Sequence, residues 1–145
     1  MRIRAVVLLF FALSAVAVPG EEVPASELAA RAAAAPLEEQ PSLYIKAAER
    51  QLKVADKLYD DGNPDAAAPL VKDVAEYSGK ATEASVRSGK HLKGTEIGIR
   101  KMAERLRDIQ HRLNYDDQAP VKAAVDKLEE LRTQLLNRMF AKDKK

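Results

Sequence analysis

Residues 95–113 read TEIGIRKMAERLRDIQHRL, and this stretch decides the fold class of the chain. Its apolar residues recur at alternating spacings of 3 and 4, which is the pattern of a helix that packs on other helices along its length. These residues are Ile99, Met102, Leu106, Ile109 and Leu113. Most other positions are charged and are expected to face water. Because a helix of this length is marginal alone in water, its apolar stripe requires partner helices elsewhere in the chain.

The composition of the 145-residue chain favours packing of helix on helix. Aromatic residues make up 5% of the sequence and there is no Trp, so the core must be aliphatic and rich in Ala. A β-sandwich or barrel would need more β-branched and aromatic residues. The absence of cysteine excludes disulfides, cysteine-ligated zinc, haem attached through cysteine and thiol catalysis.

The first 17 residues have the pattern of an export signal. Arg2 and Arg4 form a basic region ahead of a strongly apolar stretch, AVVLLFFAL, and Ala15 and Ala17 supply an A-x-A cleavage site. The alternative is a retained membrane anchor, but the apolar run is shorter than the roughly 20 residues that a spanning helix needs. We expect cleavage after Ala17 and a periplasmic or secreted product with no stable membrane anchor.

Loss of the signal peptide would leave the chain without net charge. Lys+Arg falls from 24 to 22 when Arg2 and Arg4 are removed, which equals the 22 Asp+Glu. The overall charge therefore gives no reason to expect nucleic-acid binding.

Residues 18–41 are rich in Ala and Pro and precede the helical domain. The alanines between Pro24 and Pro36 could form two helical turns with Ser26 as the N-cap. Because alanine buries little surface and prolines bound the segment, we expect a flexible tether with transient helix.

Four amphipathic segments follow, at about 42–60, 64–88, 95–113 and 120–141. The clearest turn is Gly62-Asn63-Pro64, in which Gly suits the left-handed position after a helix and Pro suits the first position of the next. Within 64–88, Pro69 is expected to kink the first turns or delay the helix start.

Four helices of similar length with short connections predict an all-α fold. We expect an antiparallel up-down-up-down four-helix bundle over residues 42–141, followed by a solvated charged tail at 142–145. Two helical hairpins side by side, as in a solenoid, are the alternative arrangement.

Small and large residues alternate over residues 51–75 at characteristic spacings. They are Ala55, Leu58, Gly62, Ala67, Val71 and Val74. This first hairpin resembles a single unit of the tetratricopeptide repeat family, which would imply peptide or protein binding on a concave face and no enzymatic activity. A shift by the family's period of about 34 residues places Glu96 and Lys101 where Gly62 and Ala67 stand, so the pattern does not repeat.

The two histidines do not predict a metal or haem site. Asp108 and His111 have the i, i+3 spacing that ferritin-like bundles use for metals, but both occupy outward positions and no second such pair exists. His91 lies in a predicted loop beside Lys90 and Lys93. We therefore expect no metal, haem or other cofactor.

Basic residues predominate in one part of the chain. Residues 87–112 contain eight basic residues against Glu96, Glu104 and Asp108. This excess could meet an anionic partner such as lipid headgroups. The alternative is an ordinary solvated helix face with i, i+4 ion pairs.

An apolar set at the end of the last helix is a candidate partner patch. Leu136 and Phe140 are i, i+4 neighbours outside the helix seam, with Met139 at their border. The alternatives are cover by Leu28 and Leu37 of the tether, or fraying of the last turn.

The whole chain resembles small exported helical proteins of bacteria, a class that brings no known activity with it. No catalytic context joins its Ser, His and Asp residues, so an enzyme is not expected. We predict a non-enzymatic exported interaction module that binds a protein or an envelope component through a helix face. The alternative is a ligand- or metal-binding helical bundle of the cytochrome or sensor kind. Partner identity and oligomeric state stay open.

Overall fold

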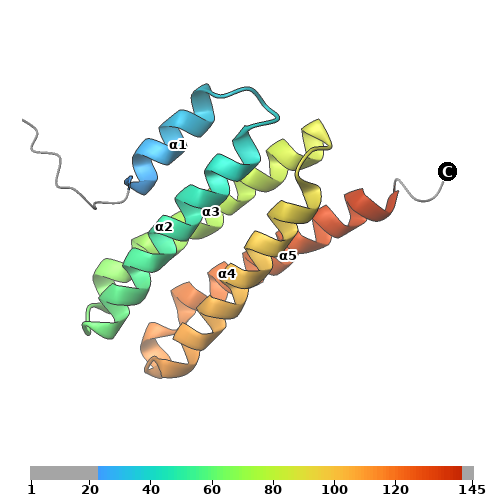
Figure 1. The fold of residues 1–145 in the computed structure, drawn as a ribbon. Coiled ribbons are helices and arrows are strands. Elements are labelled where there is room, and N and C mark those ends of the chain that lie inside the picture. The colour runs from blue at the N-terminus through green and yellow to red at the C-terminus, as the bar shows by residue number, and fades with distance from the viewer. Residues whose placement is uncertain (1–22, 142–145) are drawn as a thin grey trace, which may run out of the picture.

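The computed structural model describes residues 23–141, and over this range the chain is helical without any strand. Its elements are α1 (Ala25–Ala34), α2 (Gln40–Asp60), α3 (Pro64–Ser88), α4 (Leu92–Arg112), the short 3-10 helix η1 (Tyr115–Asp117) and α5 (Ala119–Ala141) (Figure 1). The all-α prediction is therefore confirmed. The predicted signal peptide and charged tail lie outside the described residues. No helix among those described is long and apolar enough to span a membrane.

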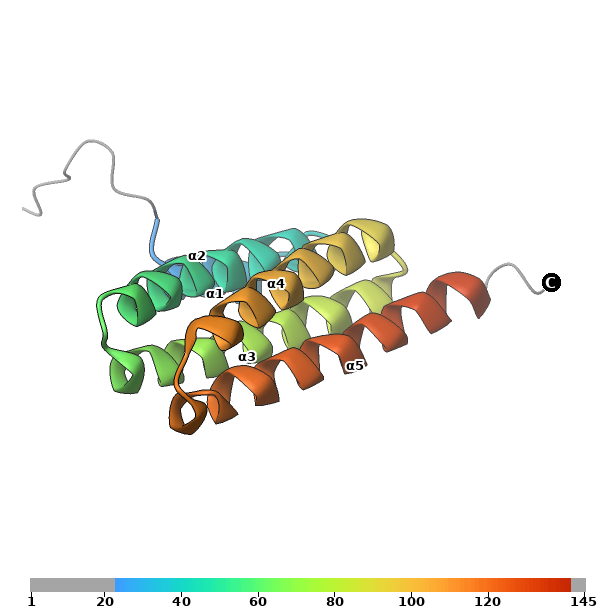
Figure 2. The same ribbon diagram turned by 90° about the horizontal axis from the view of Figure 1, so that it is seen from below.

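The four long helices form two hairpins that lie side by side. Consecutive helices run antiparallel, with α2 paired to α3 and α4 paired to α5 (Figure 1). Across the two hairpins, α4 packs on α2 and α5 packs on α3, so these lateral neighbours run parallel (Figure 2). The alternating directions agree with the expected bundle, but the neighbours are those of the alternative, two adjacent hairpins. In a bundle closed in chain order, α5 would instead return beside α2.

The turns between helices depend on left-handed backbone conformations. Gly62 has φ 76°, and the N–H groups of Gly62 and Asn63 donate to the carbonyls of Tyr59 and Leu58 at 3.1 and 2.8 Å. These two bonds satisfy carbonyls that the end of α2 would otherwise leave unpaired. Pro64 begins α3, as predicted, although the Asn63 side chain makes no capping bond.

The connection from α3 to α4 has two such residues. Gly89 has φ 70° and His91 has φ 58°, and only Lys90 lies between them. This short connection reverses the chain at the end of α3 and starts α4 on the opposite side of the core.

A single aliphatic core joins both hairpins. The predicted seam of α4 is buried at Ile99, Met102, Leu106 and Ile109, while Leu113 is half-buried. α4 approaches α2 closely at Gly98, where a Cβ atom would lie 3.0 Å from Cγ2 of Ile45. A glycine at this position therefore allows the parallel contact between α2 and α4.

Ion pairs also join α2 to α4. The Asp56 carboxylate accepts from Nε of Arg105 at 2.8 Å and from Nη2 of Arg112 at 2.7 Å. Arg112 also pairs with Asp60. Together these groups link the two hairpins along their exposed edge.

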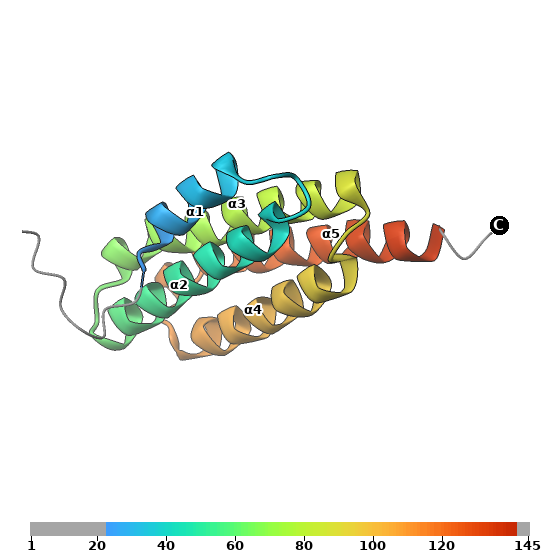
Figure 3. The same ribbon diagram turned by 45° about the horizontal axis from the view of Figure 1, so that its top comes forward.

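Helix α1 corrects the expectation of a flexible tether over residues 18–41. Residues 25–34 form a helix on the face of the first hairpin that is turned away from the second (Figure 3). Ala25, Leu28 and Ala32 are buried there. Residues 18–22 lie outside the described range.

Small side chains on both sides explain why α1 docks. Ala25 and Leu28 pack with Ala47 of α2, and Ala32 packs with Tyr44 of α2 and Ala81 of α3. Each alanine buries little area because its side chain is small. The alanine faces let the helix backbones approach closely, so that the contacts along α1 are continuous. The sequence shows the alanines of α1 but not the alanines that receive them.

Candidate functional site: the groove between α3 and α5

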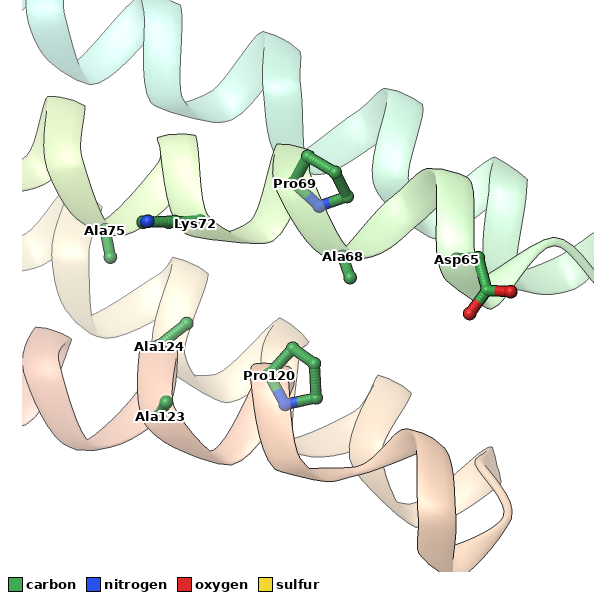
Figure 4. Close-up of a pocket in the computed structure, with 8 residues that line it drawn as sticks. All are labelled: Asp65, Ala68, Pro69, Lys72, Ala75, Pro120, Ala123 and Ala124. Atoms are coloured by element: carbon green, nitrogen blue, oxygen red, sulfur yellow. The ribbon is translucent and has the colours of Figure 1, made fainter.

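A groove of about 690 Å³ runs between the N-terminal halves of α3 and α5. Its walls are Asp65, Ala68, Pro69, Lys72 and Ala75 of α3 and Pro120, Ala123 and Ala124 of α5 (Figure 4). We call this feature the α3/α5 groove.

Small residues at the facing positions create the groove. Ala68 and Ala75 point from α3 toward α5, and Ala124 points from α5 toward α3 (Figure 4). Methyl groups are too short to fill the space between two parallel helices at this end of the molecule. The rings of Pro69 and Pro120 add further apolar surface.

Two charges stand on the wall of this apolar groove. Asp65 lies in the first turn of α3, where its carboxylate is favoured by the helix dipole, and Lys72 lies seven residues further along the same helix. Both side chains are exposed, and neither forms an ion pair with another residue in the range 23–141.

The groove lining is mostly apolar. Its ionisable side chains are the Asp65 carboxylate and the Lys72 ammonium group, and its other lining residues are alanine and proline. Over the described residues, no group of three or more His, Cys, Asp or Glu side chains is placed to hold a metal ion. The groove can accept apolar side chains and can orient them through one negative and one positive group.

The structure divides the patch predicted at the end of α5. Met139 packs against the main core, Leu136 is half-buried, and the Phe140 side chain remains 61% exposed. Leu28 is buried against α2, so it does not cover these residues. We keep the name C-terminal patch for Leu136 and Phe140, and its role in partner contact stays a prediction.

Both histidines are exposed, as are Asp108 and Lys93. His111 and Asp108 lie on the outer surface of α4, and His91 precedes its first turn. Among the described residues, the structure brings no further carboxylate or imidazole to either histidine as a third ligand.

A charged network covers the outer side of the second hairpin. Glu96 is buried and accepts from Nη2 of Arg132 at 3.0 Å, while Glu129 accepts from Nη2 of Arg107 at 2.8 Å and from Nη1 of Arg132 at 2.9 Å. Burial alone would raise the pKa of Glu129, but the hydrogen bonds and charges of Arg107 and Arg132 outweigh it and lower the pKa. The network joins α4 to α5 and is fully occupied by its own members.

Sequence reasoning did not find the α3/α5 groove. Ala68 and Ala123 look like ordinary positions outside a helix seam, and the sequence does not show that they face each other. The available signal was the recurrence of outward apolar residues, with Pro69 beside Ala68 and Pro120 three residues before Ala123. That signal identifies a surface only when the neighbouring helix is known.

Comparison of the chain with protein-family models, with curated proteins and with solved structures finds no match.

Proposed function

We propose that this chain is a non-enzymatic interaction module, exported after removal of residues 1–17, that binds an apolar segment of a protein partner in the α3/α5 groove. The observation that carries the proposal is the groove itself. It offers a largely apolar surface of alanine and proline side chains between two helices, with one acidic and one basic residue on its wall.

Helix α1 supports a helical segment as the occupant. The chain already binds one short alanine-rich helix, since α1 docks through Ala25, Leu28 and Ala32 onto small residues of the first hairpin. The α3/α5 groove offers a similar surface of alanine methyl groups. A partner helix with alanine or another aliphatic residue at i, i+3 and i+7 would fit it in the same manner.

The two charges of the groove define what the partner must carry. Asp65 and Lys72 are two helical turns apart, which corresponds to about 10 Å along the axis. The partner segment would present a basic side chain to Asp65 and an acidic side chain to Lys72. Such rim pairs contribute more to orientation and selectivity than to affinity.

A photo-crosslinking amino acid at Ala123 tests the binding site. Ala123 is exposed and lines the groove, whereas Ala66, on the same end of α3, is exposed and does not line it. In the native host we expect a covalent protein adduct from position 123 and none from position 66. Equal adducts from both positions, or none from position 123, would contradict the proposal.

A blocking variant tests the same site by another route. Ala123→Arg places a long charged side chain in the apolar groove and should weaken capture of the crosslinked partner about tenfold or more, because it fills the space and sets a charge against the apolar segment. Ala66→Arg is the matched control and should retain capture. Both variants should melt at the wild-type temperature.

The export part of the proposal has its own measurement. Intact-mass analysis of the protein recovered from the periplasm or medium should give a chain that begins at Val18. A recovered chain that still begins at Met1 would disprove cleavage, without bearing on the groove.

A further inference from the structure

The partner helix of the α3/α5 groove must carry a particular arrangement of charges, and α3 carries the same arrangement. The partner must present a basic side chain to Asp65 and an acidic side chain to Lys72, two helical turns apart, with apolar residues between them. On α3, Asp65 and Lys72 are exposed on one side of the helix, and Ala68 and Pro69 lie between them. A second α3 could therefore serve as the partner helix.

A comparable pair on α4 lacks the apolar residues. Lys101 and Asp108 are exposed and also stand seven residues apart, but Glu104 and Arg105 lie between them and are exposed as well. A helix that packed on this side of α4 would have to bury both of these charged side chains. On α3, the corresponding positions cost no such desolvation.

An antiparallel arrangement makes the exposed side of α3 complementary to itself. Asp65 and Lys72 lie at equal distances along the helix from the point midway between Ala68 and Pro69. A two-fold axis through this point reverses the second helix, so that Asp65 of each copy lies opposite Lys72 of the other. Neither side chain has to leave an existing partner, because neither forms an ion pair within residues 23–141. A parallel arrangement would instead place like charges against each other.

Two further charged residues lie one turn beyond the groove lining, and neither opposes this arrangement. On α5, Lys127 already pairs with Glu130 at 3.5 Å. On α3, Glu76 follows Lys72 by one turn. With the axis between residues 68 and 69, the two α3 helices overlap from position 64, where α3 begins, to position 73. Glu76 therefore lies outside the overlap.

Resting on the proposed function, we propose that the partner helix is α3 of a second copy of this chain. Two copies pack their α3/α5 sides together about a two-fold axis near Ala68 and Pro69, and each copy covers the α3/α5 groove of the other. Pro120 and Ala123 of α5 extend the apolar contact beside α3. The interface has an apolar centre and a polar rim, which is the usual anatomy of a protein interface.

Charge reversal tests the pairing of Asp65 with Lys72. The mature chain, residues 18–145, should form a dimer in sedimentation equilibrium. Asp65→Lys and Lys72→Glu should each raise the dissociation constant of the dimer about tenfold or more, because each variant sets like charges against each other at two places. An equal mixture of the two variants should form a heterodimer with a dissociation constant within about threefold of the wild-type value, since opposite charges meet again at both places.

Reversals on another helix are the matched controls. Lys101 and Glu104 are exposed on α4, which lies across the core from α3 and α5 (Figure 2). Lys101→Glu and Glu104→Lys should leave the dissociation constant unchanged. All four residues are exposed, so the variants should remain folded, and recovery of the dimer in the mixture verifies this for the two α3 variants.

The photo-crosslinking amino acid at Ala123 separates this inference from the proposed function. In the purified chain alone, position 123 should give a covalent adduct of twice the chain mass, and Ala66 should give none. The second copy as partner is overturned by a purified chain that stays monomeric without this adduct, by a dimer that both α3 reversals leave unchanged, or by a mixture that does not recover the dimer. An adduct with a different protein in the native host would then retain the proposed function, whereas the absence of any adduct from position 123 in the host would contradict both.

Discussion

At the scale of single residues, the core depends on side chains such as Leu106. It is fully buried at the centre of α4 and belongs to the core shared by both hairpins. Leu106→Ala should lower the free energy of unfolding by about 2–5 kcal/mol, because it removes buried methyl groups and leaves a cavity. Urea denaturation measures this. The control Glu104→Ala lies on the exposed face of the same helix and should change the free energy by no more than about 0.5 kcal/mol. Equal losses in the two variants would mean that the wrong face is buried.

Tyr59 is a residue whose polar atom opposes folding. Its hydroxyl is buried and has no hydrogen-bond partner among the described residues, and the pKa of Tyr59 is raised by burial and then by the charge of Asp117. Tyr59→Phe removes this hydroxyl without a cavity, so stability should stay equal or rise by up to about 1 kcal/mol. A loss of similar size would show that the hydroxyl is satisfied.

The same variant makes a prediction about alkaline pH. Because the pKa of Tyr59 is higher in the folded chain than its ordinary value of 10.0, the unfolded chain loses this proton first as the pH rises. Stability should therefore fall above about pH 10 in the wild type and fall less steeply in Tyr59→Phe. Some slope should remain, since burial, followed by the charges of Asp73 and Glu76, also raises the pKa of Tyr77. Denaturant titrations at a series of pH values measure the difference.

At the scale of elements, α1 is the helix whose docking the local sequence pattern does not predict. Ala32 is fully buried between α2 and α3, while the adjacent Ala33 is exposed. Ala32→Glu should displace α1 and cost about 1–3 kcal/mol, because a carboxylate cannot be buried against Tyr44 and Ala81 without a partner. The loss is limited to the docking energy of α1, since the four long helices keep their own core. Urea denaturation and faster tryptic cleavage after Arg31 report it. Ala33→Glu is the matched control, and a similar effect there would argue against docking.

At the scale of the whole molecule, the two hairpins are joined by apolar contacts and by ion pairs that converge on Asp56. Its carboxylate is only 15% exposed and accepts from two arginines of α4. Asp56→Asn should lower the free energy of unfolding by about 1–2 kcal/mol, a modest value because both arginines are about half exposed to solvent. The dependence of stability on salt should also decrease, since a screened attraction has been removed. Asp126→Asn on the exposed face of α5 is the control and should have little effect. Equal effects in the two variants would mean that apolar packing alone holds the two hairpins together.

The sequence by itself determined the helical class and most of the buried faces. Spacings of 3 and 4 in residues 95–113 repeat the geometry of one helix, so they identify which side of that helix avoids water without knowledge of any neighbour. The turn at Gly62 and Pro64 followed from the local backbone preferences of those two residues. These predictions succeeded because each depends on residues close together in the chain.

Only the tertiary structure decided which faces meet. The placement of α4 beside α2 depends on Gly98 fitting against Ile45, and the docking of α1 depends on alanines that lie far from it in sequence. The α3/α5 groove exists because Ala68 and Ala124 face each other, a relation that neither helix encodes alone. An amphipathic pattern states that a face is buried, but it does not state against what, since many aliphatic faces match in hydrophobicity and differ only in shape.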